Sequence, residues 1–127
     1  MTKETINQIL KFRDDRDWKQ FHNPKDLAIS ISLEAAELLE TFQWSGSDTE
    51  CEDKMDKIKE ELADVLNYCV LMADVCNLDI DQIVQEKIQN NNQKYPGIRH
   101  GEIKLNIVNY KYAESKLKRL VDQIVQG

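Results

Sequence analysis

The chain has 127 residues, the length of one domain, and its 17 Lys and Arg against 23 Asp and Glu give a formal net charge of −6. This negative charge disfavours general nucleic-acid binding, because it does not attract a phosphate backbone. The sequence contains no apolar run of about 18 residues that would cross a membrane, and its N-terminal segment lacks the apolar core of a secretory signal. Three cysteines without a zinc-site spacing are typical of free thiols, so we expect a cytoplasmic protein.

The small number of helix-breaking residues predicts long helices. Only four glycines and two prolines occur, which argues against a turn-rich β fold. Asn23-Pro24 is a helix-start signal, Asn77 favours a helix end, and Asp79 favours a new helix start. The sequence predicts helices over residues 3–18, 25–42, 51–76, 79–94 and 112–125, with a Gly- and Ser-containing loop over 43–49.

The element pattern predicts an all-α fold, with a bundle of four main helices and a C-terminal helical appendage. Tyr95-Pro96-Gly97 ends the fourth helix, and the apolar pattern weakens past Gly101. We therefore expect a bundle domain over residues 1–96 and a partly helical C-terminal extension over 97–127.

The second predicted helix carries two glutamates beside its apolar surface. Glu34 and Glu37 lie in one polar row, because residues three or four apart share a helical face. The row next to them is apolar and consists of Ile31, Ala35, Leu38 and Phe42. This pair of carboxylates therefore borders side chains that form a core.

The third predicted helix repeats this arrangement. Its segment from Leu62 to Val75 is apolar nearly all round, as expected of a buried helix. Asp64 nevertheless lies within it, and Glu61 and Tyr68 share the face of Asp64. Two pairs of carboxylates, each spaced by three residues, thus lie against apolar surface.

Acidic residues on helices are most often solvated surface charges, but two such pairs beside a core require neutralisation. No lysine follows Lys25 along the second predicted helix. Divalent cations neutralise carboxylates without any basic side chain. The two histidines do not stand three residues after a glutamate, which argues against a di-iron bundle. An all-carboxylate ligand set favours Mg²⁺, with Mn²⁺ as the alternative.

The ordered motifs resemble those of the all-α MazG-like nucleoside triphosphate pyrophosphohydrolases, in particular the dCTP pyrophosphatase branch. Glu34-x-x-Glu37 followed by Glu61-x-x-Asp64 matches the metal motif of that family. The resemblance covers about Ile6 to Pro96. Further matching segments are Arg16 to Pro24, Phe42-Gln43-Trp44, Glu60 to Leu66 and Lys94-Tyr95-Pro96.

The resemblance implies Mg²⁺-dependent hydrolysis of a (d)NTP to a monophosphate and pyrophosphate, with dCTP or a modified pyrimidine nucleotide as substrate and cleaning of the nucleotide pool as the role. It implies that Glu34, Glu37, Glu61 and Asp64 are the metal ligands. On general chemical grounds, Glu34 or Glu37 is also the candidate to orient or deprotonate the attacking water. By the same resemblance, the nucleotide-binding residues are Trp18, Phe21, His22, Trp44, Tyr68, Asn91 and Lys94. Apart from the resemblance, the fourth predicted helix offers Lys87 or Lys94 as a phosphate contact, because a triphosphate is negatively charged.

Family members assemble as dimers or tetramers, so we expect a homodimer or homotetramer, and the broad apolar surface of the second and third helices agrees with this. Trp18 and Trp44 flank opposite ends of the second helix, which is about 27 Å long at 1.5 Å per residue. Unless the chain folds back, these two aromatic groups are too far apart to bind one base within a single chain. We therefore predict a nucleotide site that is shared between two subunits. The alternative to an enzyme is a catalytically silent helical module that only oligomerises.

Overall fold

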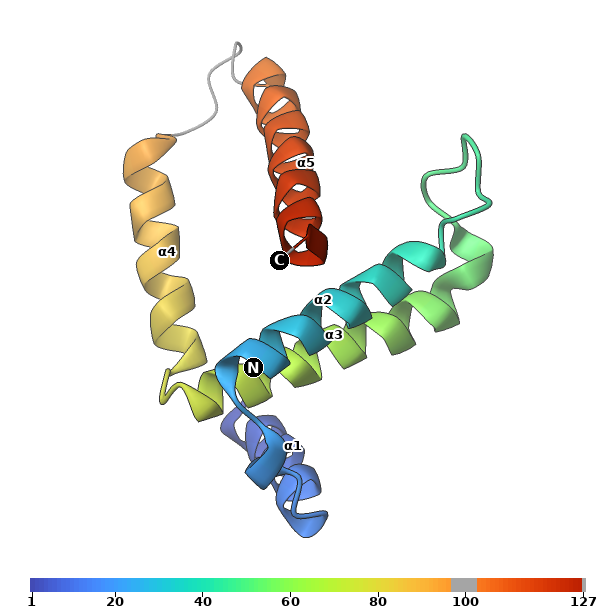
Figure 1. Ribbon diagram of the computed structural model, residues 1–127. Helices are drawn as coiled ribbons and strands as arrows, with labels where there is room; N and C mark the ends of the chain where they lie inside the picture. Colours follow the sequence, from blue (N-terminus) through green and yellow to red (C-terminus); the bar gives the residue numbers. More distant parts are fainter. Residues whose placement is uncertain (97–102, 127) are drawn as a thin grey trace. The chain divides into compact units, whose positions relative to one another are not determined.

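The computed structural model describes residues 1–96 and 103–126, the latter with backbone alone over 103–110, and within these ranges every regular element is helical (Figure 1). The chain divides into two compact units, Met1–Lys87 and Ile88–Gly127. The first unit contains both predicted pairs of carboxylates, so the fold of this unit decides the geometry of the site.

The centre of the first unit is an antiparallel pair of helices, α2 (Pro24–Glu40) and α3 (Met55–Val75) (Figure 1). The predicted start of α2 is confirmed, because the Asn23 side chain accepts a hydrogen bond from the Asp26 amide at 2.9 Å and Pro24 occupies the first turn. Because α3 runs back along α2, its C-terminal half lies beside the beginning of α2.

The ends of α3 are fixed by residues in the left-handed backbone region. Cys51, with φ of 47°, is 1% exposed and precedes the short 3-10 helix η2 (Glu52–Lys54), so α3 begins four residues later than predicted. Asn77, with φ of 54°, follows the helix, and the Leu78 amide donates to the Ala73 carbonyl at 2.8 Å. The predicted helix end at Asn77 is thereby confirmed.

The core of the first unit is small. Its buried apolar residues are Leu27, Cys51, Val70, Leu71 and Ala73. Three polar residues, Arg13, Thr41 and Glu61, are buried with them. Buried charged groups need specific partners, so Arg13 and Glu61 mark positions where the fold is built around a polar contact.

Helix α1 (Lys3–Asp15) packs against α3. It ends three residues before the predicted Trp18, because Asp17 adopts a left-handed conformation with φ of 56° and turns the chain. The 3-10 helix η1 (Lys19–Phe21) then leads into α2. The segment predicted as the end of a helix is therefore a turn, which presents Trp18 beside α1.

Helices α4 (Ile80–Lys94) and α5 (Ile103–Gln126) complete the chain. The predicted cap of α4 is confirmed, since Asp79 accepts a hydrogen bond from the Gln82 amide at 2.8 Å. Helix α4 ends before Pro96 as predicted, while Gly97 lies outside the described residues. Helix α5 starts nine residues before the predicted Tyr112, because no glycine or proline interrupts residues 103–126 even where the apolar stripe is irregular.

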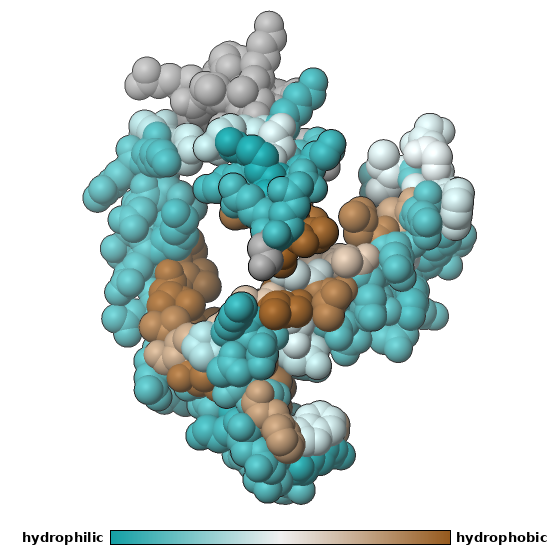
Figure 2. All heavy atoms as spheres, viewed as in Figure 1, coloured by the Kyte–Doolittle hydropathy of each residue, from teal (hydrophilic) through white to brown (hydrophobic). Residues whose placement is uncertain are grey.

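Helices α2 and α3 leave large apolar side chains exposed. Figure 2 shows hydrophobic residues gathered over α2 on the face in view. The exposed large apolar residues of the two helices are Ile29, Leu33 and Leu39 on α2, and Met55, Leu62 and Leu66 on α3. Over residues 1–96 and 103–126, no helix has both the length and the apolar character needed to span a bilayer.

Candidate active site

Carboxylates from α2 and α3 meet in one cluster. One carboxylate oxygen each from Glu34, Glu61 and Asp64 lies within 4.8 Å of the others. Glu37, one turn further along α2, is exposed beside Glu34, and its negative charge acts on that residue. The two predicted pairs are therefore on facing sides of the α2/α3 interface, because the antiparallel helices place residues 34 and 61–64 at the same level.

The cluster is electrostatically unfavourable as it stands. Burial, followed by the neighbouring carboxylates Glu37, Asp64 and Glu61, raises the pKa of Glu34 above its ordinary value. Oε2 of Glu34 and Oε2 of Glu61 are both buried without a hydrogen-bond partner among the described residues. Buried carboxylate oxygens lose their hydration, so both atoms require a cationic or proton-donating partner.

Lys57 supplies part of the missing positive charge, a role that the sequence reasoning did not assign to any lysine. Its Nζ lies 2.7 Å from Oε1 of Glu61, one turn away along α3. The hydrogen bond to Glu61 and the charges of Glu61 and Glu60 raise the pKa of Lys57. Lys57 neutralises one oxygen of one member and leaves the other carboxylates of the cluster uncompensated.

The donor set fits a divalent cation. All the atoms are carboxylate oxygens, which hard cations prefer, and two oxygens on opposite sides of a bound Mg²⁺ are about 4.2 Å apart. The oxygens of Glu34, Glu61 and Asp64 approach this spacing. The two buried oxygens without partners are the atoms that a cation would satisfy. Together with Glu37, these residues can hold a metal ion.

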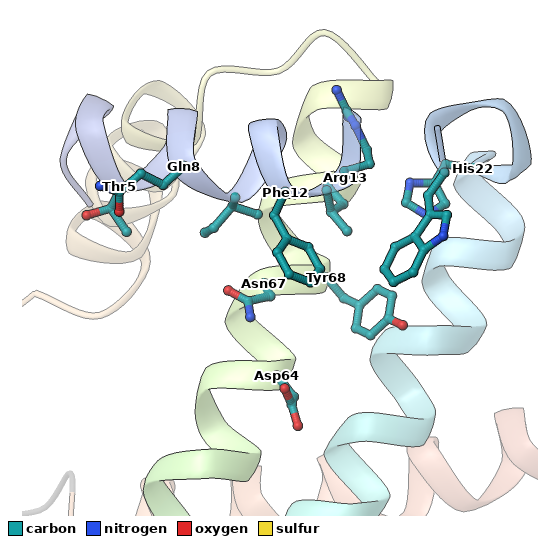
Figure 3. A pocket seen from close by; sticks show the side chains of 11 residues that line it. Thr5, Gln8, Phe12, Arg13, His22, Asp64, Asn67 and Tyr68 are labelled. Carbon is teal, nitrogen blue, oxygen red and sulfur yellow. The ribbon is translucent and has the colours of Figure 1, made fainter. Parts of the chain in front are cut away.

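A pocket of about 420 Å³ opens beside the cluster and includes one of its members (Figure 3). Helix α3 contributes Asp64, Asn67, Tyr68 and Leu71 to its wall, and the turn after α1 contributes Trp18 and His22. The remaining lining residues come from α1 and are Thr5, Gln8, Ile9, Phe12 and Arg13. Asp64 therefore belongs both to the carboxylate cluster and to the wall of a cavity of ligand size.

Aromatic side chains form much of the pocket away from Asp64. The rings of Phe12 and Trp18 pack edge to face, with centroids 5.8 Å apart. The Arg16 guanidinium lies 3.4 Å from the centroid of the Phe12 ring, and this cation–π contact stabilises the position of the ring. Figure 3 shows Tyr68 turned toward the same space as Phe12, and Trp18 lines this pocket as well. Flat apolar surfaces of this kind suit stacking on a planar ring.

His22 brings a neutral polar group to this end of the pocket. Burial, and then the positive charge of Arg13, lower its pKa below the ordinary value. Its Nδ1 is buried and has no hydrogen-bond partner among the described residues. His22 can therefore accept or donate a hydrogen bond toward a ligand without carrying charge.

The structure brings together only some of the predicted nucleotide-binding residues. Trp18, His22 and Tyr68 line the pocket that contains Asp64. Phe21 and Trp44 are 68% and 85% exposed and do not line it. The exposed Lys87 is absent from its lining too. Asn91 and Lys94 belong to the second unit, so their nucleotide-binding roles stay predictions. The division of the chain at residue 96 and the metal-ligand roles of the four carboxylates stay predictions as well.

The geometry also corrects the distance argument for a shared site. Trp18 reaches the pocket of Asp64 within one chain, because α3 folds back along α2 and α1 packs against α3. A second subunit is therefore not needed to bring this segment to the carboxylates. Sharing between subunits stays a prediction for Trp44, which lies in the turn after α2.

Sequence reasoning missed the contribution of α1 and of two polar residues on α3. Arg13 falls on the face of Ile6, Ile9 and Leu10, so a charged residue on an apolar stripe was an available signal. Asn67 is one of the few polar residues of α3 and stands one turn after Asp64. The position of Lys57, four residues before Glu61, was a third signal.

The helical fold and the facing carboxylates define the class of protein. The chain belongs to the MazG-like family, whose model matches residues 29–108. The predicted all-α fold and the family resemblance are thereby confirmed.

Relatives within this class agree with the branch that the motifs indicate. The chain is 40% identical to dCTP pyrophosphatase 1 of Mus musculus over 102 residues, and 36% identical to that of Homo sapiens over 101 residues. Each match covers 75% of this chain, and the chain spans only 59% of the length of each relative. A pyrophosphatase from Archaeoglobus fulgidus superposes with a TM-score of 0.70 at 41% identity, over 75% of this chain and 92% of the other.

Proposed function

We propose that this chain is a Mg²⁺-dependent nucleotide pyrophosphohydrolase that converts a (d)NTP to its monophosphate and pyrophosphate. The substrate proposed is dCTP or a modified pyrimidine deoxynucleotide, and the role is cleaning of the nucleotide pool. One observation carries the proposal: Asp64 joins a carboxylate cluster to an aromatic pocket of about 420 Å³. The names of the relatives support the choice of dCTP.

The carboxylate end of the site receives the triphosphate. A triphosphate with about four negative charges is repelled by Glu34, Glu37, Glu61 and Asp64 unless cations lie between them. When bound, Mg²⁺ or Mn²⁺ neutralises the charge that develops on the phosphate oxygens and the leaving pyrophosphate. The four residues hold the metal in this proposal, which explains why oxygens of Glu34, Glu61 and Asp64 are clustered and why Oε2 of Glu34 and of Glu61 have no hydrogen-bond partner among the described residues.

The attacking water is positioned by Glu34 or Glu37, the two catalytic candidates. Glu37 is exposed at the edge of the cluster, whereas Glu34 is half-buried within it. Either carboxylate can accept a proton from a water molecule at hydrogen-bond distance. Both assignments stay open in the proposal, and substitution of each residue separates them.

The aromatic end of the site receives the base and the sugar. Trp18 and Tyr68 offer stacking surfaces, and neutral His22 offers a hydrogen bond. Phe21 and Trp44 join the site only when a second copy of the chain or a movement of their segments presents them, because both are exposed. The proposed phosphate contacts Lys87 and Lys94, with Asn91, complete the set.

We further propose a cytoplasmic homodimer or homotetramer. The exposed apolar residues of α2 and α3 form neighbouring stripes, an arrangement that favours association of identical copies. All three cysteines are free, in agreement with a reducing compartment. A nucleotide is the partner proposed, without nucleic acid or membrane.

A pyrophosphate-release screen over a panel of nucleoside triphosphates tests this function. We expect the highest rate with dCTP or a modified pyrimidine deoxynucleotide, and no rate when EDTA removes the metal. Phosphorus NMR of the reaction is expected to show pyrophosphate and the monophosphate appearing together. Stepwise release of orthophosphate with a diphosphate intermediate would contradict the proposed reaction.

Thermal melting separates the enzyme from a silent oligomerisation module. A ligand that binds the folded state raises the melting temperature, so Mg²⁺ with a nonhydrolysable dNTP should stabilise an enzyme of this class. A melting temperature that no nucleotide changes would favour the silent module.

A further inference from the structure

Arg13 is a buried cation at one end of the pocket, and the proposed mechanism gives this residue no role. It lies in the last turn of α1 and is 3% exposed. Arginine is almost never fully buried unless its charge is paired, so the contacts of this side chain have to account for its position. Figure 3 places Arg13 at the opposite end of the pocket from Asp64, which belongs to the carboxylate cluster proposed to hold the metal.

The guanidinium of Arg13 connects two helices. Its Nη1 donates to Oδ2 of Asp74 on α3 at 2.6 Å, and its Nε donates to Oδ1 of Asp14 on α1 at 2.9 Å. The Asp14 contact is local, since the two residues are adjacent in the chain. The Asp74 contact instead fixes the end of α1 to the helix that carries Asp64 and Tyr68.

The backbone of Arg13 holds the turn that presents Trp18. Its carbonyl accepts hydrogen bonds from the Arg16 and Trp18 amides, each at 3.2 Å. Between these two donors the chain reverses at Asp17, the residue in the left-handed conformation. The position of Trp18 therefore depends on the position of Arg13, whose side chain is tied to α3.

We propose that Arg13 is a positioning residue for nucleoside binding, which fixes Trp18 in the wall of the pocket that Tyr68 also lines, through its ion pair with Asp74. The inference rests on the proposed function. Arg13 touches neither the phosphates nor the reacting atoms in this scheme, so its effect is on substrate affinity and not on the chemical step. Asp74 shares the role, while Asp14 does not, because it contacts the same guanidinium without linking α1 to α3.

Steady-state kinetics with the best nucleotide of the screen test this assignment. Arg13→Met and Asp74→Asn are each expected to raise KM by about tenfold, the scale of losing one base–aromatic stacking contact, with kcat changed less than about twofold. The matched control Asp14→Asn should leave both constants within about twofold of the wild type. Should Arg13→Met fail to fold, the isosteric Asp74→Asn carries the same test.

Three kinetic results would overturn the assignment in folded variants. These are an unchanged KM in Arg13→Met and Asp74→Asn, a fall in kcat with unchanged KM, and an equal rise of KM in Asp14→Asn. In the double variant the two effects should not add, because both substitutions break one contact. Additive effects would place the two residues in separate roles.

A measurement without nucleotide keeps this inference separate from the proposed function. In a Trp44→Phe background, acrylamide quenching reports on Trp18 alone, because the chain contains two tryptophans. Quenching is expected to increase with Arg13→Met and with Asp74→Asn, and to stay unchanged with Asp14→Asn. Failure of the wild type to hydrolyse any nucleotide would refute the function, whereas unchanged quenching in all three variants would refute the positioning role.

Discussion

Substitution of Lys57 by methionine is expected to tighten the binding of a divalent cation. Lys57 lies 2.7 Å from Glu61, and a cation held by the cluster is repelled by this ammonium group. Methionine keeps a long unbranched side chain and the helix propensity while removing the charge. The substitution therefore increases the net negative charge at the site without removing a ligand.

The magnitude follows from the distances. A cation about 2.1 Å from a Glu61 oxygen lies about 5 Å from the Lys57 nitrogen, given the contact at 2.7 Å. A single and a double positive charge about 5 Å apart in water repel by an amount equivalent to about tenfold in a dissociation constant. The dielectric of water is the right choice here, because the Lys57 side chain is 55% exposed.

Calorimetric titration of the metal-free protein with Mn²⁺ measures the change. The matched control is Lys59→Met, which removes the same charge from α3 at an exposed position outside the cluster. Its effect should be much smaller, and the effect of Lys57→Met should shrink at about 1 M salt, where the screening length is about 3 Å. Weaker binding in Lys57→Met would refute the reasoning and would mean that Lys57 organises Glu61 for the metal.

Further expectations concern catalysis, pH and packing. Glu37→Gln and Asp64→Asn should each abolish turnover, while circular dichroism shows unchanged helix content; near-normal turnover of both at saturating Mg²⁺ would exclude the four-carboxylate site. The pKa of His22 is lowered in the folded protein, so the unfolded chain binds a proton at this residue more readily than the folded protein does. The contribution of neutral His22 to the free energy of unfolding is therefore present above about pH 6.5 and is lost as the pH falls. Urea denaturation of the metal-free protein between pH 7 and 5 should therefore show a steeper loss for the wild type than for His22→Asn. Leu27→Ala should lower the free energy of unfolding by about 3 kcal/mol, because the side chain is 2% exposed; a loss below about 1 kcal/mol would mean that the α2/α3 interface refills the space.

Local signals in the sequence were sufficient to predict helix boundaries where one or two residues determine the backbone conformation. Asn23-Pro24, Asn77 and Asp79 each predicted a helix boundary that the structure has. Short-range spacing carried the information at these boundaries. The family resemblance, and not helical spacing, joined the carboxylates of the two helices in one ligand set, and the structure brings an oxygen of Glu34, Glu61 and Asp64 within 4.8 Å of the others.

Long-range geometry accounts for what could not be predicted. The proximity of Trp18 to Asp64 depends on the direction of α3 relative to α2 and on the packing of α1, neither of which appears in a helical period. The early end of α1 depends on the left-handed Asp17, a conformation that the surrounding charged residues do not indicate. Arg13 was overlooked because its partner Asp74 is 61 residues away.

The family model begins at residue 29, and the pocket crosses that boundary. The four carboxylates lie inside the matched segment, while α1, Trp18 and His22 lie before it. Under the proposed function, part of the wall that contacts the base, including Trp18 and His22, comes from the segment before the family match, so substitutions there can change the accepted base without altering the four carboxylates. Grafting residues 1–22 between relatives of different nucleotide preference would then transfer substrate choice while the bond that is broken stays the same.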